Sequence, residues 1–525
     1  MGNFVKNIAF NYYFLHIFYY VSLIVLSSYI LFRLENEKLT FVDSLFTCTS
    51  AIGQVGLIVI ETSKFNVNSQ TLIVILILLG NPIIISILPL LVKINKYRKK
   101  LKQLIFDEEE RYQIKLNKKA NEYLVIIILF YFVVIVSLGA IFFLFALKDK
   151  NLFSDKKMTQ FKIKNYSENI WFSLFYTISG FSNAGFTLLN DSLVALNENY
   201  LAIFVQMILI VLGNFGFPIF LRIFIEFLIC NFPNNKTFQF INQNTRFLYS
   251  HLLSASDCVK LFLIFCFITI SQWMLISYLD WDNMYIFSKH YSNFDKLFNE
   301  LFQSISTRNC GLYSIHYYYG SNSVLFVYMI FMLLSAFPLV ISIRNSNKNS
   351  YVAEQKNFES FDLVTNTEDL SSTSDDGVKV DVAQMPKLYF LDNPKHRTVF
   401  YFIKEMIYYD FLVIIVVISF ISFFEYDKFA VHNDQFSLMK IIFEVISGYG
   451  SVGLSLEVNS ISYSALFSTS SKIVMMFAIL FGRLRVLPHS NDAAITGEIS
   501  YPLQLPVNRS PVDQLEINYI TPVNK

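Results

Sequence analysis

The sequence predicts an all-α membrane protein of four fused helix–pore loop–helix units, with eight transmembrane helices and four re-entrant loops around one central pore. Three observations predict it: the composition, eight long apolar runs, and a short glycine-containing segment that occurs four times. Of the 525 residues, 54% are hydrophobic and only 16% are charged, whereas soluble proteins carry about a quarter charged residues. The composition therefore indicates a polytopic membrane protein.

The charge and the cysteines give no sign of a nucleic-acid-binding, metal-binding or disulfide-rich protein. The net charge is +2, which gives no reason to expect a nucleic-acid partner. The five cysteines lie in or beside apolar segments, without the spacing of a metal site or a disulfide framework. The N-terminal apolar run is long enough to be a true span, so we do not expect a cleaved leader there.

Eight apolar runs each reach the ~20 residues that a helix needs to cross the hydrocarbon core. They are 9–33, 69–92, 123–147, 198–230, 257–279, 323–343, 399–424 and 463–482. An even number of crossings places both termini on the same side of the membrane. The connector 93–122 holds ten lysines and arginines, which predicts that it and both termini are cytoplasmic. Connector 148–170 is then external although it carries six lysines, and the glycosylation sequons at Asn165 and Asn190 lie on that same side.

These runs divide the chain into four units and their connectors. We expect units at 1–95, 121–230, 256–344 and 399–485, a basic cytoplasmic connector at 96–120, a second at 231–255, and a cytoplasmic tail at 486–525. The connector 345–398 is polar, acidic and low in aliphatic residues, which predicts disorder. Its serines near Asp375 are candidates for phosphorylation, but a plain solvated linker is the favoured interpretation.

One short segment recurs four times, each time between two apolar runs. The copies are FTCTSAIGQVGL (46–57), FYTISGFSNAGF (175–186), FQSISTRNCGL (302–312) and FEVISGYGSVGL (443–454). Each has a Phe–Ser framework, a polar residue two positions before the last glycine, a small residue just before it and a bulky apolar residue after it. The third copy is one residue shorter. Four glycines in one local frame are a far stronger signal than a single packing glycine.

Membrane physics gives these segments a function. Non-helical backbone at membrane depth is tolerated only when it is buried in protein or lines a water-filled cavity. The first part of each segment predicts a half-helix whose carbonyl end, which carries partial negative charge, favours a cation. The glycine then allows positive φ and turns carbonyls inward. Four such strands predict a ring of oxygens that replaces the water shell of a monovalent cation. The residues are Val55, Gly56, Ala184, Gly185, Cys310, Gly311, Val452 and Gly453.

The four segments resemble the pore loops of the Trk/Ktr/HKT superfamily of potassium and sodium transporters, and fungal Trk and plant HKT members most of all. The resemblance is closest in FEVISGYGSVGLSL and FGRLRVLPHSNDAAI of the last unit, with LGNFGFPIFLR (212–222) and STRNCGL (306–312) matching the second and third. It covers about 400 residues. It implies that Gly56, Gly185, Gly311 and Gly453 supply the carbonyls that bind K⁺, and that the chain forms homodimers with one pore per subunit.

Several further residues are assigned roles around the loops. Lys472 lies within the last apolar run, where a lysine costs about 2.5–3.5 kcal/mol unless it faces protein or water. The family has a basic residue there that braces the loops, and we expect an ion pair with Glu444; a lysine that only reaches toward the interface is the alternative. Asn183 and Asn309, two positions before their glycines, are further support residues.

Separate predictions concern the outer mouth of the pore and a gate below the filter. Glu61 and Glu457 follow two filter glycines, so we expect them at the outer mouth, where they would concentrate cations; ordinary surface charges are an equal alternative. By resemblance, the third unit's second helix forms a gate, assigned to Ser335, Ala336 and Pro338. Arg483 is either a pore-lining barrier or an interfacial anchor.

The sequence thus predicts a plasma-membrane protein for potassium uptake down the electrochemical gradient, embedded in the lipid bilayer, with transported K⁺ and no cofactor. No nucleotide-binding loop is found, so a regulatory subunit would be a separate cytoplasmic chain. Sodium permeation, or symport of K⁺ with Na⁺ or H⁺, is the alternative within transport. Gly56 resembles the potassium-permeable pattern, but Ile58, Val59 and Ile60 depart from the polar residues usual there. A membrane enzyme is a remote alternative because the histidines form no intramembrane constellation.

Overall fold

The computed structural model describes residues 12–485, except 36–37, 103–107, 148–165, 214–215, 288–290, 335–398, 432–435 and 458–460. Within these residues the chain is helical and has no β-strand. The predicted disordered connector 345–398 and the tail 486–525 lie outside the described residues.

The helices repeat as a long first helix, a short helix and a second helix; the short helix, which the sequence predicts to enter the pore, is called the pore helix. The first unit has α2 (Tyr12–Leu34), α3 (Phe41–Gly53) and α4 (Val67–Gly80), and the second has α7 (Glu108–Ala146), α8 (Tyr166–Phe181) and α9 (Tyr200–Gly213). The third has α13 (Ala255–Asp280), α14 (Asn293–Ser306) and α15 (Asn322–Leu334), and the fourth has α17 (Val399–Phe424), α19 (Leu438–Tyr449) and α20 (Thr469–Leu484). A 3₁₀ turn precedes each second helix: η1 (Thr62–Lys64), η3 (Val194–Leu196), η4 (Tyr317–Tyr319) and η7 (Tyr463–Leu466).

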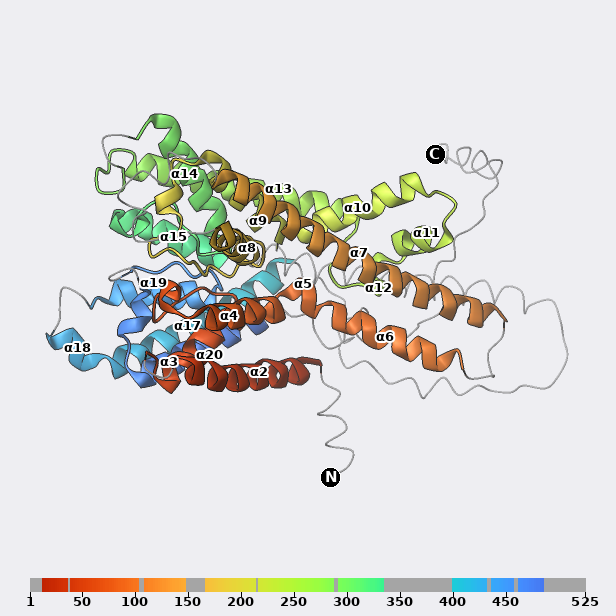
Figure 1. The fold of residues 1–525 in the computed structure, drawn as a ribbon, viewed down its shortest axis with the longest axis horizontal. Coiled ribbons are helices and arrows are strands. Elements are labelled where there is room, and N and C mark those ends of the chain that lie inside the picture. Colours follow the sequence, from red (N-terminus) through yellow and green to blue (C-terminus); the bar gives the residue numbers. More distant parts are fainter. Residues whose placement is uncertain are drawn as a thin grey trace, which may run out of the picture.

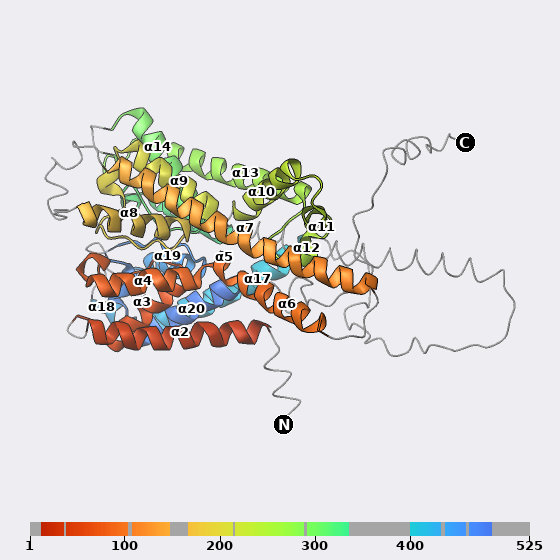
Figure 2. The same cartoon turned by 45° about the vertical axis from the view of Figure 1, so that its right-hand side comes forward.

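The remaining helices connect or extend the units. They are α5 (Pro82–Ile85), α6 (Ile87–Lys100), α10 (Phe217–Asn231), α11 (Lys236–Gln243), α12 (Thr245–Leu248) and α18 (Tyr426–Val431). Figures 1 and 2 both show α6 and α7 projecting together beyond the bundle at the end opposite α18, with α11 and α12 against them. The basic connector 96–120 is therefore largely helical: α7 alone has 39 residues, or about 58 Å at 1.5 Å per residue.

Two of the eight apolar runs are bent rather than straight. Helix α4 and the helices after Pro82 meet at 55°, and α9 and α10 meet at 80°. Proline supplies no N–H to the preceding turn, and Asn81 caps the new helix by accepting from the Ile83 amide at 2.8 Å. Among the described residues, three helices are long and apolar enough to span a membrane alone, or up to five if each bent pair counts as one. The number of eight crossings stays a prediction.

The pore helices begin where the sequence supplies a cap. Thr40, Ser292 and Ser437 each accept a hydrogen bond from the backbone N–H three residues later, at the starts of α3, α14 and α19. Such caps satisfy amides that the first helical turn leaves without partners. At the other end, α3 stops at Gln54, which adopts the left-handed conformation. The half-helices are therefore delimited by local sequence.

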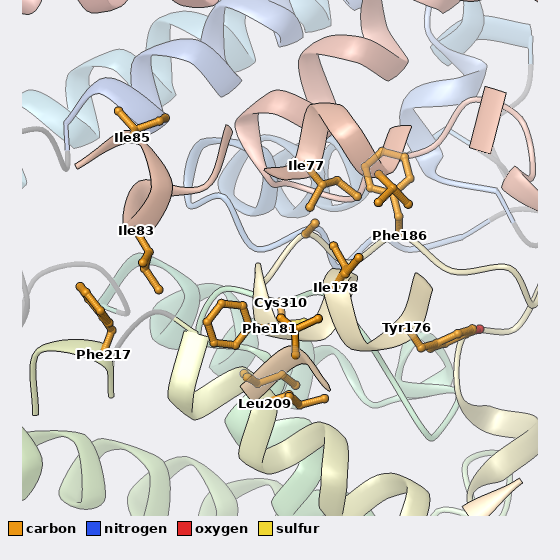
Figure 3. Packing of buried hydrophobic residues seen from close by; sticks show 14 of the residues in the cluster. Ile77, Ile83, Ile85, Tyr176, Ile178, Phe181, Phe186, Leu209, Phe217 and Cys310 are labelled. Atoms are coloured by element: carbon orange, nitrogen blue, oxygen red, sulfur yellow. The ribbon is translucent and has the colours of Figure 1, made fainter. Parts of the chain in front are cut away.

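The pore helices are arranged in a closed order. Each packs against the second helix of the preceding unit: α8 on α4, α14 on α9, α19 on α15, and α3 on α20 of the fourth unit. Figure 3 shows part of the interior, where Ile178 and Phe181 of α8, Leu209 of α9 and Cys310 lie together. The fourth-to-first contact closes the ring.

The first helices face outward with large apolar side chains. Phe267 on α13 is 73% exposed and Phe423 on α17 is 75% exposed. Isolated exposed apolar residues are ordinary on soluble proteins, but long apolar helices with such faces suit a lipid environment. This surface agrees with the predicted membrane class.

Candidate functional site

The four loops after the pore helices share one hydrogen bond. In each, the amide of the residue before the glycine donates to the carbonyl of the framework serine. The pairs are Val55–Ser50 (2.9 Å), Ala184–Ser179 (2.8 Å), Cys310–Ser306 (2.9 Å) and Val452–Ser447 (2.9 Å). The bond folds the chain back on the end of the pore helix, so each loop begins its turn at the same place.

The turn then requires positive φ. The values are +88° at Gly56, +71° at Gly185, +66° at Gly311 and +90° at Gly453. Other residues rarely adopt this region, which explains the recurring glycine. In three loops the polar residue two positions earlier also has positive φ: Gln54, Asn183 and Ser451. Asn309 is not among them, because the third loop is one residue shorter.

The four glycines form a cycle through neighbouring main chains. A Cβ on Gly56 would lie 2.6 Å from the Ala184 oxygen, and one on Gly185 would lie 2.5 Å from the Cys310 oxygen. A Cβ on Gly311 would lie 2.5 Å from the Val452 oxygen, and one on Gly453 would lie 1.6 Å from the Val55 oxygen. Real Cβ atoms essentially never approach a heavy atom closer than 3.0 Å. Only glycine therefore allows these four carbonyls to lie so near the next loop.

Side chains brace the loops from behind. The hydroxyl of Ser179 donates to the Phe186 carbonyl at 2.7 Å, that of Ser306 donates to the Leu312 carbonyl, and that of Ser447 accepts from the Gly453 amide at 3.0 Å. Asn183 reaches its own second helix, donating to the Ile210 carbonyl at 3.3 Å. Asn309 bonds to other described residues only through its backbone amide, to the Ser306 carbonyl.

The second helices approach the ends of the pore helices through glycines. A Cβ on Gly80, Gly213 or Gly482 would lie 2.1, 1.5 or 1.9 Å from the carbonyl oxygen of Ile52, Phe181 or Tyr449 respectively. These three oxygens occupy equivalent positions, six residues after the framework phenylalanines. Close packing is therefore the structural reason for glycine at positions 80 and 213, where α4 and α9 end.

Hydrogen bonds cross all four unit boundaries outside the loops. Trp171 donates to Gln70 at 2.9 Å between the first and second units, and the Leu193 amide donates to the Tyr313 carbonyl at 2.9 Å between the second and third. Tyr317 donates to the Ser455 carbonyl at 2.6 Å between the third and fourth. The Ile58 amide donates to the Ser462 hydroxyl at 2.9 Å, joining the first unit to the fourth.

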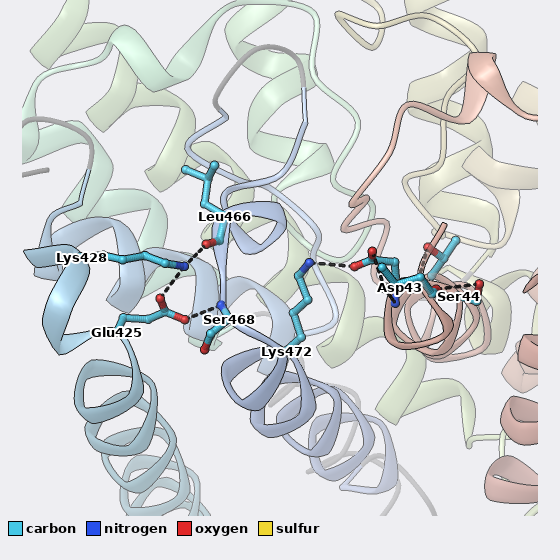
Figure 4. A network of polar contacts seen from close by, with 9 residues as sticks. Asp43, Ser44, Glu425, Lys428, Leu466, Ser468 and Lys472 are labelled. Atoms are coloured by element: carbon cyan, nitrogen blue, oxygen red, sulfur yellow. Dashed lines mark hydrogen bonds and ion pairs between the residues drawn. The ribbon is translucent and has the colours of Figure 1, made fainter. Parts of the chain in front are cut away.

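The predicted ion pair of Lys472 with Glu444 is wrong. The Lys472 ammonium lies 2.7 Å from Asp43 Oδ1, at the start of the first pore helix (Figure 4). Glu444 is fully buried and accepts instead from the Ser455 hydroxyl at 2.6 Å and the Ser464 amide at 2.9 Å. Lys472 therefore joins the fourth unit to the first, whereas Glu444 secures its own unit.

Arg483 is buried and is not an interfacial anchor. Its guanidinium donates at 2.6 Å both to Gln54 Oε1 and to the Gly80 carbonyl, so it braces the first loop from the fourth unit. Ser335, Ala336 and Pro338, the residues predicted to form a gate, lie outside the described residues. Glu61 forms an ion pair with Lys64 at 2.8 Å, and Glu457 accepts from the Tyr313 hydroxyl at 2.7 Å.

Asp43, Gln54 and Ser462 are site residues that sequence reasoning missed as partners. Their contacts join positions more than 400 residues apart, which no local pattern reveals. The one available signal was the order of the units, since four units around an axis must place the fourth beside the first.

A comparison with protein families finds a match over residues 84–500 to TrkH, described as a cation transport protein. Among individual proteins, a Dictyostelium discoideum protein is 32% identical over 326 residues (62% of this chain, 42% of the relative). Potassium transport protein 1 of Schizosaccharomyces pombe is 30% identical over 335 residues (62% and 36%). The low-affinity potassium transport protein of Saccharomyces cerevisiae is 28% identical over 345 residues (62% and 38%).

The matched region spans about two fifths of the length of these relatives. Among solved structures, the crystal structure of the potassium transporter TrkH from Vibrio parahaemolyticus matches with 14% identity and a TM-score of 0.48, covering 90% of this chain and 82% of that one.

Proposed function

The chain belongs to the TrkH family of cation transport proteins, and from this premise we propose that it takes up potassium ions across the plasma membrane. The curated fungal relatives are potassium transport proteins by name, which supports K⁺ as the cargo. The family consists of transporters, not enzymes.

We infer that the ion passes through the ring formed by the four loops. The observation that carries this proposal is the cycle of glycine-to-carbonyl approaches from Gly56 to Ala184, Gly185 to Cys310, Gly311 to Val452 and Gly453 to Val55. A ring of main-chain oxygens held by fixed hydrogen bonds replaces the hydration shell of an alkali ion without rearrangement. Asn183, Arg483 and the serine braces hold the loops in position, and Glu61 and Glu457 lie beyond the glycines, toward the outer mouth.

The driving force is the membrane potential, worth about 2.3 kcal/mol per charge per 100 mV. Uptake down that gradient needs no energy-coupling domain, so the proposal is channel-like conduction with both termini cytoplasmic. Movement of Na⁺, or coupling to Na⁺ or H⁺, is the alternative within the same family. The homodimer, the separate regulatory subunit and the gate at 335–338 belong to this proposal as extensions from the family resemblance.

Expression in cells that lack potassium uptake tests this function. The chain is expected to restore growth at low external K⁺, and to carry inward currents when K⁺ or Rb⁺ is the external cation. Replacing external K⁺ by Na⁺ separates the two ion preferences, because a sodium-permeable pore keeps its current. Absence of both rescue and cation current, with the protein present at the cell surface, would refute transport.

A further inference from the structure

In three of the units, a carboxylate at the end of the first helix binds the start of the second helix of the same unit. The carboxylate accepts from the backbone amide just before the second helix. The pairs are Glu35–Asn66 (2.6 Å), Asp280–Ser321 (3.3 Å) and Glu425–Ser468 (2.6 Å). The second unit uses an amide instead: Asn199 donates to the Ala146 carbonyl at 2.7 Å. We call the three carboxylate contacts the helix clamps.

A second residue completes each helix clamp, three positions after the carboxylate. It donates to the carbonyl two residues before the clamped amide. The contacts are Lys38 to Lys64 (2.7 Å), Asn283 to Tyr319 (3.2 Å) and Lys428 to Leu466 (2.5 Å). The three helix clamps thus have one geometry, which follows from the internal repeat.

The third helix clamp differs from the others in charge. In the first and fourth units the second residue is a lysine, whose ammonium also pairs with the carboxylate: Lys38–Glu35 at 3.0 Å and Lys428–Glu425 at 2.7 Å (Figure 4). In the third unit the neutral Asn283 takes that place. Asp280, which is 3% exposed, therefore has a neutral amide where Glu35 and Glu425 each have a lysine ammonium.

The third unit also adds a second carboxylate beside the first. Glu300 of α14 is fully buried; its Oε2 accepts from the Ser277 hydroxyl, and its Oε1 has no hydrogen-bond partner. Asp280 and Glu300 line the same pocket, with Ile276, Tyr317, Val324 and Tyr328 among its walls. The space between these side chains is narrow, and none of it is wide enough for a water molecule.

No lysine or arginine in the described part of the chain forms an ion pair with either carboxylate. Lys296, one turn before Glu300, donates to the Trp281 carbonyl at 2.8 Å and lies over the Trp281 and Phe287 rings. Tyr317 donates away from the pocket, to the Ser455 carbonyl. Two buried carboxylates without a direct ion pair are disfavoured: desolvation and repulsion from Asp280 oppose the charge of Glu300, and Lys296 offsets them only at longer range.

We propose that the third unit binds one monovalent cation between Asp280 and Glu300, in the place that the lysine ammonium occupies in the first and fourth units. The ligand is a proton or a dehydrated Na⁺, because the pocket does not admit a sphere the size of a water molecule and K⁺ is about that large. The site lies within the third unit, separate from the ring of loop carbonyls. It stands on the comparison of the three helix clamps and does not depend on the proposed potassium uptake.

The internal repeat supplies the decisive variant, Asn283→Lys, which introduces the ammonium of the other two helix clamps. Thermal unfolding of the purified full-length chain is measured in choline, Na⁺ and K⁺ buffers, each from about pH 9 to about pH 6. The wild-type Tm is expected to rise when Na⁺ replaces choline or when the pH falls, whereas K⁺, which is too large for the pocket, should act as choline does. Asn283→Lys is expected to unfold at a higher Tm in choline at high pH and to lose that dependence. Asn283→Gln, the matched neutral control, keeps it.

The pattern of buffers identifies the ligand. A rise with falling pH alone assigns a proton, and a rise with Na⁺ but not with K⁺ at constant pH assigns Na⁺. An equal rise with Na⁺ and K⁺ is a general salt effect and counts against the site. The double variant Asp280→Asn, Glu300→Gln removes the charges themselves and is expected to lose the same dependence, which covers the case in which Asn283→Lys does not fold. If Tm depended on Na⁺ and pH equally in the wild type and in these variants, the site would be overturned. A wild-type Tm that changes with neither Na⁺ nor pH would also overturn it.

Rubidium uptake by the same variants separates this proposal from the functional one. Uptake by the wild-type chain, together with unchanged Tm dependence in the variants, would leave transport standing and reject the site. Tm dependence that the variants abolish, in a chain that carries no Rb⁺, would support the site and reject transport.

Discussion

Replacing Gly453 with alanine is expected to abolish potassium uptake. Gly453 has a φ of +90°, and a Cβ there would lie 1.6 Å from the Val55 oxygen. Holding a non-glycine residue in such a conformation costs on the order of 1–3 kcal/mol, and the collision with a backbone atom is relieved only if the fourth loop moves away from the first. The ring then opens at that boundary. Rubidium uptake in cells deficient in potassium uptake measures the loss.

The matched control is Gly139→Ala in α7. A Cβ at Gly139 meets only side-chain methyl groups, of Leu209 at 2.8 Å and Thr177 at 2.9 Å, and glycine costs a helix interior about 1 kcal/mol relative to alanine. This variant is expected to keep most of the uptake. If Gly453→Ala transported as well as Gly139→Ala at equal surface levels, the fourth loop would not belong to the filter.

Lys472→Gln is the second substitution with a large expected effect. The Lys472–Asp43 pair joins α20 to the start of α3 across the boundary that closes the ring, and the two side chains are 12% and 14% exposed. Leaving one charge of a fully buried pair alone costs about 3–5 kcal/mol, and we expect about 1–3 kcal/mol for this partly exposed pair. Uptake should fall in Lys472→Gln and in Asp43→Asn alike, whereas Lys472→Arg should retain it.

A double-mutant cycle isolates the pair. If the two side chains act on each other, the double variant Asp43→Asn, Lys472→Gln is expected to lose no more than either single variant. Lys260→Gln is the control, because the Lys260 side chain is 71% exposed and its pair with Asp257, at 3.6 Å, is worth about 0–1 kcal/mol. Additive losses in the double variant, or undisturbed uptake in Asp43→Asn, would contradict the assigned partner.

The local parts of the site could be predicted from the sequence because local physics determines them. Positive φ requires glycine at Gly56, Gly185, Gly311 and Gly453, so a glycine frame that recurs four times is enough to indicate four similar turns. Capping by Thr40, Ser292 and Ser437 likewise depends on the next three residues. The hydroxyls of three framework serines, Ser179, Ser306 and Ser447, each make a hydrogen bond within their own loop, which gives serine a local role at this position.

The partners across unit boundaries could not be predicted in this way. Glu444 looked like the partner of Lys472 because both are charged groups of the fourth unit, but Asp43, 429 residues away in sequence, lies beside the ammonium. The burial of Arg483 against the first unit has the same origin, since only the closed order of the units places α20 next to α4. Gly80 and Gly213 pack on pore-helix carbonyls at the ends of α4 and α9, and hydropathy does not report this packing.

Electron cryo-microscopy of the purified chain in Rb⁺ tests the central claim most directly. Ion density is expected on the axis enclosed by the four loops, surrounded by main-chain carbonyl oxygens of the four glycines and of the residue before each: Val55–Gly56, Ala184–Gly185, Cys310–Gly311 and Val452–Gly453. Loops that stand apart or face lipid, with no ion between them, would contradict it.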